Sequence, residues 1–336
     1  MIVYVASADS GEIAVLRLDA DRGDWAPVQT MSVGSQVMPL AVSPDRGHLY
    51  AALRAPPYAV VTLRIDPRDG RLTETGRSPL PHSMACVATD RSGRCLLAAS
   101  YGGHLLSVSP IGDDGVAGAP AQVVPAGRHA HAVQTDPSNR RLYVTCLGDD
   151  VVLRFALDAD LARVSPDGSF PMRAHAGPRH FVFHPGGRFV YVLNELDACV
   201  DVLAFDAQTG VLALRQTVST LPPSFDGQPW AADLHLTPDG RFLVTSERTS
   251  STLATFRVDA ASGELAPLAH TPTERQPRGF HIDPSGRWLV AVGQVSHAAT
   301  LYAIDGASGA LTPHRRCALG QNPNWVEIVD LPGRWD

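Results

Sequence analysis

The sequence predicts an all-β protein: a seven-bladed β-propeller of four-stranded antiparallel blades, whose ring is closed by the N- and C-terminal strands in one blade. Two observations carry this prediction. A pattern of two β-rich runs joined by a turn occurs six times, at spacings of 46 to 53 residues, and a seventh copy is divided between the two ends of the chain. Repeats of about 40–50 residues with turn signals at fixed places are typical of propeller blades.

Each complete copy has an apolar run, an anchor position that is usually Pro, a tight turn and a second β-rich run. Pro followed by Asp-Gly, Gly-Gly or Ser-Gly favours a hairpin rather than a helix cap. Two further strand candidates follow, as in 59–64 and the run that begins at 70. Four antiparallel strands per repeat are therefore expected. The anchors are Pro44, Arg91, Pro137, Pro185, Pro238 and Pro284.

The two chain ends complete the seventh copy. Residues 324–330 supply one strand, and 3–7 matches its missing partner. A ring joined in this way removes the unpaired sheet edges that an open array would leave. We therefore expect a single domain over 1–336, with the last blade shared by about 1–33 and 323–330. The alternative is an open solenoid of seven imperfect repeats.

Composition excludes several classes of function. All 28 basic residues are arginine, and the net charge of −6 comes without an acidic or basic run, so no nucleic-acid or membrane partner is expected. The absence of lysine excludes P-loop and Schiff-base chemistry. The five cysteines are odd in number and lack Cys-x-x-Cys spacing, which argues against a disulfide framework or a zinc site. Residues 1–20 resemble neither a signal peptide nor a membrane span, so we expect a cytoplasmic protein.

Two positions of the repeat carry polar residues where a purely structural position would repeat one apolar residue. In a propeller the first strand of each blade lines the central channel, so equivalent positions converge at one rim. Six residues before the anchor, the copies include His131, Arg179, Arg278 and Asn324. Ten residues after the anchor, at the same end of the hairpin, they include Arg54, Tyr101, Glu195, Arg248 and Gln294.

Clustered arginines repel one another unless an anion is bound, so these two columns predict an anion pocket. The alternative is that the arginines pair with blade-edge carboxylates and only solvate the rim. Opening of a lactone by water needs a base, a donor for the carbonyl oxygen and a hold on the substrate. Glu195 or His131 could serve as the base. A carboxylate among arginines would have a lowered pKa and be a poor base, so His131 is preferred, with Glu195 to orient it or the water and Arg179 as the oxyanion donor. The predicted substrate-binding residues are Arg278, Arg54, Arg248, Tyr101, Gln294 and Asn324.

Other polar pairs carry weaker predictions. Asp233 and His235 share one face of a strand, where they would be catalytic, metal-binding or locks between blades, and the last is preferred. His180 and His184 have a metal-like spacing but fall in a strand and a turn. The two rim columns offer few oxygen ligands, so no metal site is predicted.

Four strings are more specific than the repeat itself: Ala176-Gly-Pro-Arg-His-Phe-Val-Phe-His-Pro185, Tyr191-Val-Leu-Asn-Glu-Leu196, Trp230-Ala-Ala-Asp-Leu-His235 and Gln276-Pro-Arg-Gly-Phe280. Together they resemble the propeller-type bacterial 6-phosphogluconolactonases of the lactonase and cycloisomerase-2 family, nearly end to end. The resemblance implies hydrolysis of 6-phospho-D-glucono-1,5-lactone, a small anionic sugar lactone, in the pentose phosphate pathway without an obligatory cofactor. It also implies four active residues, which fall on His131, Arg179, Glu195 and Arg278.

Two other functions remain open. Clustered arginines suit a carboxylate as well as a phosphate, so another lactone enzyme of this fold is one alternative: a muconate-type cycloisomerase or a lactonase for an unphosphorylated sugar acid. A non-catalytic propeller scaffold is the other. Many such scaffolds carry a Trp-Asp dipeptide in each repeat, but here only Trp335-Asp336 matches, outside the repeats. An enzyme with polar residues at the axis is therefore preferred.

Overall fold

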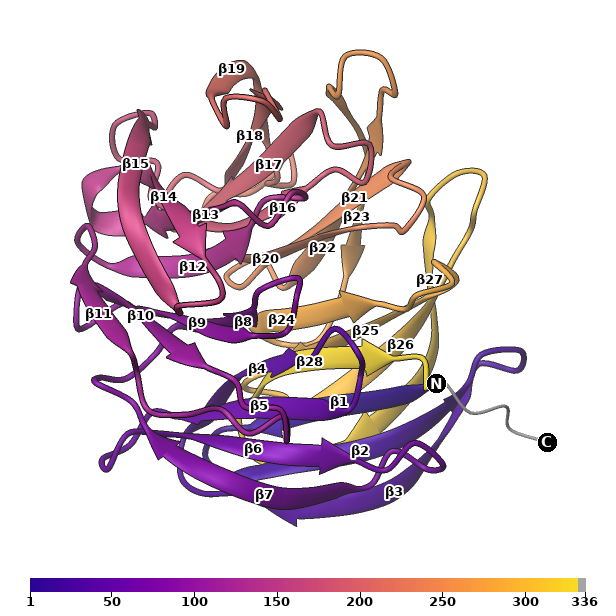
Figure 1. The fold of residues 1–336 in the computed structure, drawn as a ribbon. Coiled ribbons are helices and arrows are strands. Elements are labelled where there is room, and N and C mark those ends of the chain that lie inside the picture. Colours follow the sequence, from indigo (N-terminus) through magenta and orange to yellow (C-terminus); the bar gives the residue numbers. More distant parts are fainter. Residues whose placement is uncertain (332–336) are drawn as a thin grey trace.

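The chain forms a ring of seven four-stranded antiparallel sheets around a central channel (Figure 1). This is the predicted propeller. The computed structural model describes residues 1–331, so Trp335-Asp336 lies outside the described residues. Within that range the only helix is the short 3-10 turn η1 (Leu147–Asp149), and no helix is long and apolar enough to cross a membrane.

The blades are numbered here by their inner strands. Blade 1 holds β4 (Val37–Val42), β5 (His48–Leu53), β6 (Ala59–Ile65) and β7 (Leu72–Pro79). Blade 2 holds β8 (Cys86–Thr89), β9 (Cys95–Ser100), β10 (Leu105–Pro110) and β11 (Gln122–Pro125). Blade 3 holds β12 (Ala130–Thr135), β13 (Arg141–Cys146), β14 (Val151–Asp158) and β15 (Arg163–Pro171). Blade 4 holds β16 (Pro178–Phe183), β17 (Phe189–Asn194), β18 (Cys199–Phe205) and β19 (Leu212–Ser219).

The remaining three blades complete the ring. Blade 5 holds β20 (Ala231–Leu236), β21 (Phe242–Glu247), β22 (Thr252–Val258) and β23 (Leu265–Pro272). Blade 6 holds β24 (Pro277–Ile282), β25 (Trp288–Gly293), β26 (Ala298–Ile304) and β27 (Leu311–Ala318). Blade 7 holds β28 (Pro323–Val329), β1 (Ile2–Ser7), β2 (Glu12–Asp19) and β3 (Asp24–Ser32).

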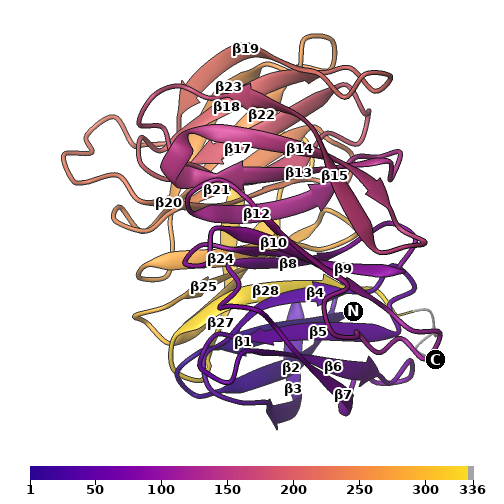
Figure 2. The same cartoon turned by 60° about the vertical axis from the view of Figure 1, so that its left-hand side comes forward.

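Blade 7 confirms that the two ends of the chain close the ring. The C-terminal strand β28 is its inner strand and pairs antiparallel with β1, in register from Ile2 opposite Val329 to Ala6 opposite Trp325. The indigo and yellow strands therefore lie side by side in Figures 1 and 2. Closure therefore gives the seventh blade its inner strand, so all seven blades have four strands.

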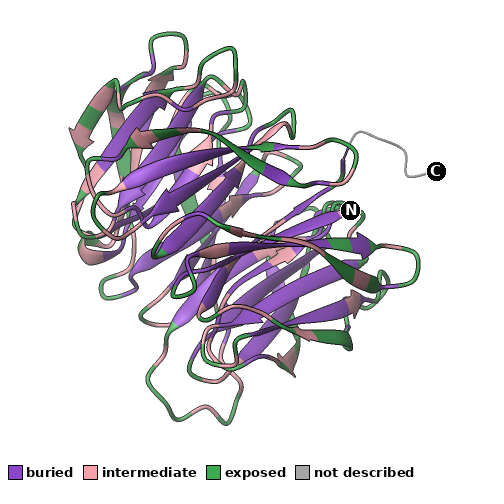
Figure 3. Ribbon diagram, turned by 90° about the horizontal axis from the view of Figure 1, so that it is seen from below, coloured by how far each residue is buried: buried purple, intermediate pink, exposed green. Residues whose placement is uncertain are grey.

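The core lies between the blades. The inner three strands of a blade are mostly buried, as in β17, whereas outer strands such as β19 are largely exposed (Figure 3). A repeated contact joins neighbouring blades: Tyr4, Tyr50, Tyr143 and Tyr191 each donate a hydroxyl hydrogen bond to a glycine carbonyl of the next blade, at 2.8–2.9 Å. This contact ties each of these four blades to its neighbour.

Candidate active site

Beta-bulges in the inner strands build one wall of the site. In blade 3, Ala130 pairs with Cys146 and Ala132 with Thr145, which leaves His131 as the extra residue. The same shift occurs at Arg179 in β16, at Arg278 in β24 and at Asn324 in β28. A bulge re-aims the side chain of its extra residue. The four polar members of the predicted column six before the anchor are thus all bulge residues.

Left-handed residues tie this column to the second one. His129, Gly177 and Gln276, each two residues before a bulge residue, have φ between 57° and 69°. Their carbonyls accept hydrogen bonds from the backbone N–H groups of Leu147, Glu195 and Gln294, at 3.1, 2.8 and 3.1 Å. These hydrogen bonds hold Leu147, Glu195 and Gln294 beside the bulge residues of their own blades. Each of the three directly follows the second strand of its blade.

Glu195 is the centre of an ion-pair cluster. One of its oxygens, Oε2, accepts hydrogen bonds from Arg179 Nε and Arg248 Nη2, both at 2.8 Å. The two guanidinium side chains are only 1% and 3% exposed. Arg179 Nη1 also donates to the Ala232 carbonyl, and Arg248 Nε donates to the Trp230 carbonyl at 3.0 Å. These contacts fix both arginines, and Arg248 in particular is bound to the protein rather than open to a ligand.

Arg54 and Arg278 have far fewer partners. Arg54 Nε donates to Ser83 Oγ at 3.0 Å, whereas Arg278 makes no hydrogen bond or ion pair within residues 1–331. Burial, together with Arg179 and Arg248, lowers the pKa of Arg278 well below its ordinary value. A guanidinium in a protein nevertheless stays charged. The positive charge of Arg278 therefore has no partner within residues 1–331 and can pair with an anionic ligand.

His131 is a buried, neutral imidazole beside these charges. It is 4% exposed, and its Nδ1 has no hydrogen-bond partner among the described residues. Burial and the charge of Arg179 hold its pKa well below the usual value. The Tyr101 ring lies edge-on to it, 6.1 Å between centroids, and stacks on His129 at 4.1 Å. A neutral imidazole is the form that accepts a proton from water.

The carboxylate of Glu195 is ionised. Burial alone would raise its pKa, but Arg179 and Arg248 outweigh burial and hold the pKa below its ordinary value. An ionised carboxylate with a lowered pKa is a weak base and a strong hydrogen-bond acceptor. Its chemistry therefore suits orientation of the arginines or of water better than proton removal.

The structure places Gln294 and Asn324 at the same rim, but not on the arginines. Gln294 Nε2 donates to Asn322 Oδ1 at 2.7 Å, and Asn324 Nδ2 donates to the Asn322 carbonyl at 2.8 Å. Within residues 1–331 neither side chain bonds to Arg54, Arg179, Arg248 or Arg278. Both residues brace the loop before β28.

Three residues of the site were not singled out by the sequence columns. The indole of Trp230 lies 3.9 Å from the Arg248 guanidinium carbon, His129 stacks on Tyr101, and Ser83 accepts from Arg54. All three occupy the position eight before the anchor. Comparing the repeats at that third position would have brought them to attention.

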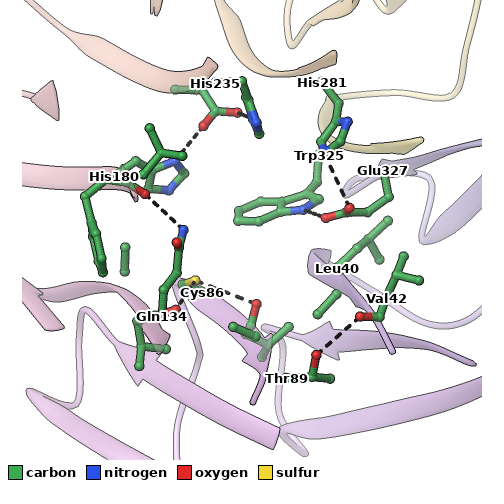
Figure 4. A pocket seen from close by; sticks show the side chains of 18 of the residues that line it. Leu40, Val42, Cys86, Thr89, Gln134, His180, His235, His281, Trp325 and Glu327 are labelled. Carbon is green, nitrogen blue, oxygen red and sulfur yellow. Dashed lines mark hydrogen bonds and ion pairs between the residues drawn. The ribbon is translucent and has the colours of Figure 1, made fainter. Parts of the chain in front are cut away.

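Below the arginines, the channel holds a cavity of about 330 Å³ lined by the inner strands (Figure 4). Asp233 joins three blades there: its carboxylate lies 2.7 Å from His180 Nδ1 and 3.4 Å from His235 Nε2, and it accepts from the Phe280 N–H at 3.3 Å. These contacts favour the interpretation of Asp233 as a lock between blades. His184 does not join them, since its Nε2 lies 3.2 Å from the Gly240 carbonyl.

Comparison with known proteins agrees with this architecture. A family model described as "Lactonase, 7-bladed beta-propeller" matches residues 2–328. A 6-phosphogluconolactonase of Pectobacterium carotovorum is 43% identical over 332 residues, covering 98% of this chain and 99% of that protein. A 6-phosphogluconolactonase of Serratia proteamaculans is 44% identical over 330 residues, covering 98% of both.

Solved structures show the same ring. The periplasmic gluconolactonase of Pseudomonas aeruginosa superposes with a TM-score of 0.91 at 28% identity, covering 98% of this chain and 99% of that one. A Lactobacillus plantarum protein superposes equally well, at 27% identity and with 98% and 100% coverage. Together with the family match over nearly the whole chain, these similarities show that the chain belongs to the lactonase seven-bladed β-propeller family.

Proposed function

We propose that this protein hydrolyses 6-phospho-D-glucono-1,5-lactone to 6-phosphogluconate, a step of the pentose phosphate pathway. The observation that carries the proposal is the pair Arg54 and Arg278, half-buried guanidinium groups without a carboxylate partner among the described residues, beside the neutral imidazole of His131. The names of the relatives that match end to end support the same substrate.

In the proposed reaction His131 takes a proton from water as the hydroxide adds to the lactone carbonyl. Negative charge then builds on the carbonyl oxygen. Arg179 Nη2 makes no hydrogen bond among the described residues, so it remains free to donate to that oxygen. When the ester C–O bond breaks, the proton held by His131 returns to the ring oxygen, which becomes a hydroxyl group, and the new carboxylic acid then ionises by giving its proton to His131. Glu195, held by Arg248, keeps Arg179 in place throughout.

The phosphate is assigned to Arg54 and Arg278. A guanidinium matches phosphate oxygens with two parallel donors, and both side chains have free donors in the described structure. Tyr101 lies at the same rim, with its ring edge-on to His131 at 6.1 Å between centroids. Gln294 and Asn324 contribute by holding the rim loop. No step requires a cofactor.

The second candidate substrate is the unphosphorylated glucono-1,5-lactone, because the Pseudomonas aeruginosa gluconolactonase shares this fold at 28% identity. The two substrates differ by one phosphate. The contacts of Arg54 and Arg278 with that phosphate, called the arginine clamp here, would therefore decide which substrate is preferred. A phosphorylated sugar does not cross membranes unaided, and we accordingly propose a cytoplasmic location.

The test compares hydrolysis of the two lactones by the wild-type protein and by Arg278→Ala, with the uncatalysed rate subtracted. Loss of charge-assisted hydrogen bonds worth about 1.5–3 kcal/mol should raise KM for the phosphorylated lactone roughly ten- to a hundredfold. The unphosphorylated lactone should be hydrolysed slowly by both proteins. Arg241→Ala is the matched control, because Arg241 is 56% exposed and pairs with Asp239 within its own turn. Equal KM values for Arg278→Ala and wild type would contradict the clamp.

A further inference from the structure

The cavity below the arginines has one polar wall, which we call the channel arc: His180, Asp233, His235, His281 and Glu327, from the neighbouring strands β16, β20, β24 and β28. Successive members are close. Asp233 lies 2.7 Å from His180 Nδ1 and 3.4 Å from His235 Nε2. The His235 and His281 rings are 4.7 Å apart between centroids, and His281 Nε2 lies 3.8 Å from Glu327 Oε2. Figure 4 shows the arc members His180, His235, His281 and Glu327 around the cavity.

Packing alone does not require these residue types. The facing side of the cavity is lined by residues of blades 1 and 2, among them Leu40 and Val42 (Figure 4). Three residues before the anchor, where blades 5 and 6 carry His235 and His281, these two blades carry Ala41 and Ala88. Buried imidazole and carboxylate groups cost free energy to desolvate, which apolar side chains avoid. A function for the arc is therefore to be expected beyond the blade contacts of Asp233.

The arc begins at the proposed base. The His131 and His180 rings are 5.1 Å apart between centroids, and His131 Nδ1 and His180 Nε2 both lack a partner among the described residues. A volume of about 330 Å³ is several times the roughly 30 Å³ that one water occupies in the liquid. His180 lines this cavity and its ring neighbours that of His131, so water in the cavity can reach the arc beside the proposed base.

The arc also leads out of the buried site. Side-chain exposure is 11% and 12% for His180 and Asp233, and rises to 28% for His235, 26% for His281 and 20% for Glu327. His131 itself is 4% exposed. The arc therefore connects a buried imidazole to the end of the channel away from the arginines.

The reaction supplies a proton that has to leave. Water adds to the lactone, the ester bond breaks, the ring oxygen keeps one proton, and the new carboxylic acid ionises, so one proton is released per turnover. On the substrate side, Arg54, Arg179, Arg248 and Arg278 repel a proton. On the other side, Asp233 and Glu327 attract it.

We propose that the channel arc is a proton exit route, in which His180 receives the proton from His131 through water and passes it along the arc to Glu327 and solvent. This inference rests on the proposed function, since it takes His131 as the base. The protonation properties of the arc agree with the direction of transfer. Burial and Arg179 lower the pKa of His131 well below its ordinary value, and burial lowers that of His180 to about 4. At the far end, burial raises the pKa of Glu327 to about 7, so the last member of the arc holds a proton more strongly than His180 does. Burial lowers the pKa of His281 to about 3, so His281 passes a proton on rather than holding it.

The test measures kcat of His180→Gln and Glu327→Gln in weak and in concentrated imidazole buffer. Without the route, proton release should limit turnover, so kcat in weak buffer should fall at least about tenfold and recover with imidazole. KM should stay unchanged, because neither residue contacts the arginine clamp. Gln134→Met is the matched control, since Gln134 lines the same cavity but does not titrate. Wild type and this control should show no dependence on imidazole.

Two results would overturn the exit route. One is wild-type kcat in weak buffer for both variants. The other is a loss of kcat that imidazole does not restore and that accompanies a raised KM, which would show a structural role only. A wild-type protein without any lactonase activity would instead overturn the proposed function and leave the arc without a reaction to serve.

Discussion

At the scale of single residues, the site is defined by which of its arginines have an ion-pair partner and which do not. Glu195 balances part of the charge of Arg179 and Arg248, whereas Arg54 and Arg278 carry charges that no described carboxylate contacts. A buried charge without a partner is unfavourable, and that cost is relieved when an anion binds. The same field acts on His131, whose protonation would add a further positive charge to the cluster.

An anion in the clamp should therefore raise the pKa of His131. In the free protein, burial and Arg179 hold this pKa well below 6.5, so His131 should stay neutral at every pH where the enzyme is active. Bound 6-phosphogluconate cancels part of the arginine field, which favours the protonated form. The measurement is an NMR titration of the His131 ring with and without the product.

A second variant separates the effect of the arginine charges on the pKa of His131 from the effect of burial on that pKa. Arg278→Ala removes one positive neighbour but leaves His131 buried, so the pKa should rise even without product, and product should add less. If His131 titrates near 6.5 in the free wild type and does not respond to product, the arginine field is not what controls it.

At the scale of strands and turns, the repeat pattern was sufficient to predict the blades and both polar columns. It did not predict why His131, Arg179 and Arg278 turn into the channel. The cause is a bulge that follows a left-handed residue, and only Gly177 among those residues is a type that signals positive φ. The contact of His180 with Asp233 was also out of reach, because it joins residues 53 positions apart on neighbouring blades.

Gly177→Ala tests whether this backbone geometry positions the site. Gly177 has φ +69°, and a Cβ there would lie 2.6 Å from Leu196 Cγ, directly beside Glu195. The left-handed conformation costs an alanine about 1–2 kcal/mol, and the clash adds to it. The Gly177 carbonyl accepts from the Glu195 N–H, so displacement should also disturb the pairing with Arg179 and lower kcat.

Gly187→Ala is the matched control for that variant. Gly187 has φ +67° with no atom within 4 Å of an added Cβ, so alanine there meets the same backbone cost without a clash. Thermal unfolding and kcat of the two variants give the answer. Both should be less stable, and only Gly177→Ala should lose activity. A loss of kcat in both would indicate that general destabilisation, not geometry, is responsible.

At the scale of the whole molecule, ring closure creates one channel with two different ends. The arginine cluster occupies one end, and imidazoles and carboxylates line the cavity toward the other. Because all seven inner strands share this channel, protonation of its buried groups affects the stability of the ring as a unit. His131, His180 and His281 are buried as neutral groups, with pKa values well below the usual range, about 4 and about 3 respectively.

As the pH is lowered, the ring should therefore begin to unfold at a higher pH than protonation of its carboxylates alone would explain. Below pH 6.5 the unfolded chain binds protons at these three histidines and the folded ring does not, so stability falls as pH falls. Glu327 acts in the opposite sense, because its folded pKa of about 7 lies above the unfolded value, and lower pH favours its folded form. Three groups against Glu327 and His235, whose pKa the Asp233 carboxylate raises despite burial, give a decrease on the order of 2 kcal/mol per pH unit between about pH 6 and 4.5. Urea unfolding across this range measures it: His281→Gln should make the decrease shallower and Glu327→Gln steeper, whereas a flat profile would mean that the histidines are protonated inside the folded ring.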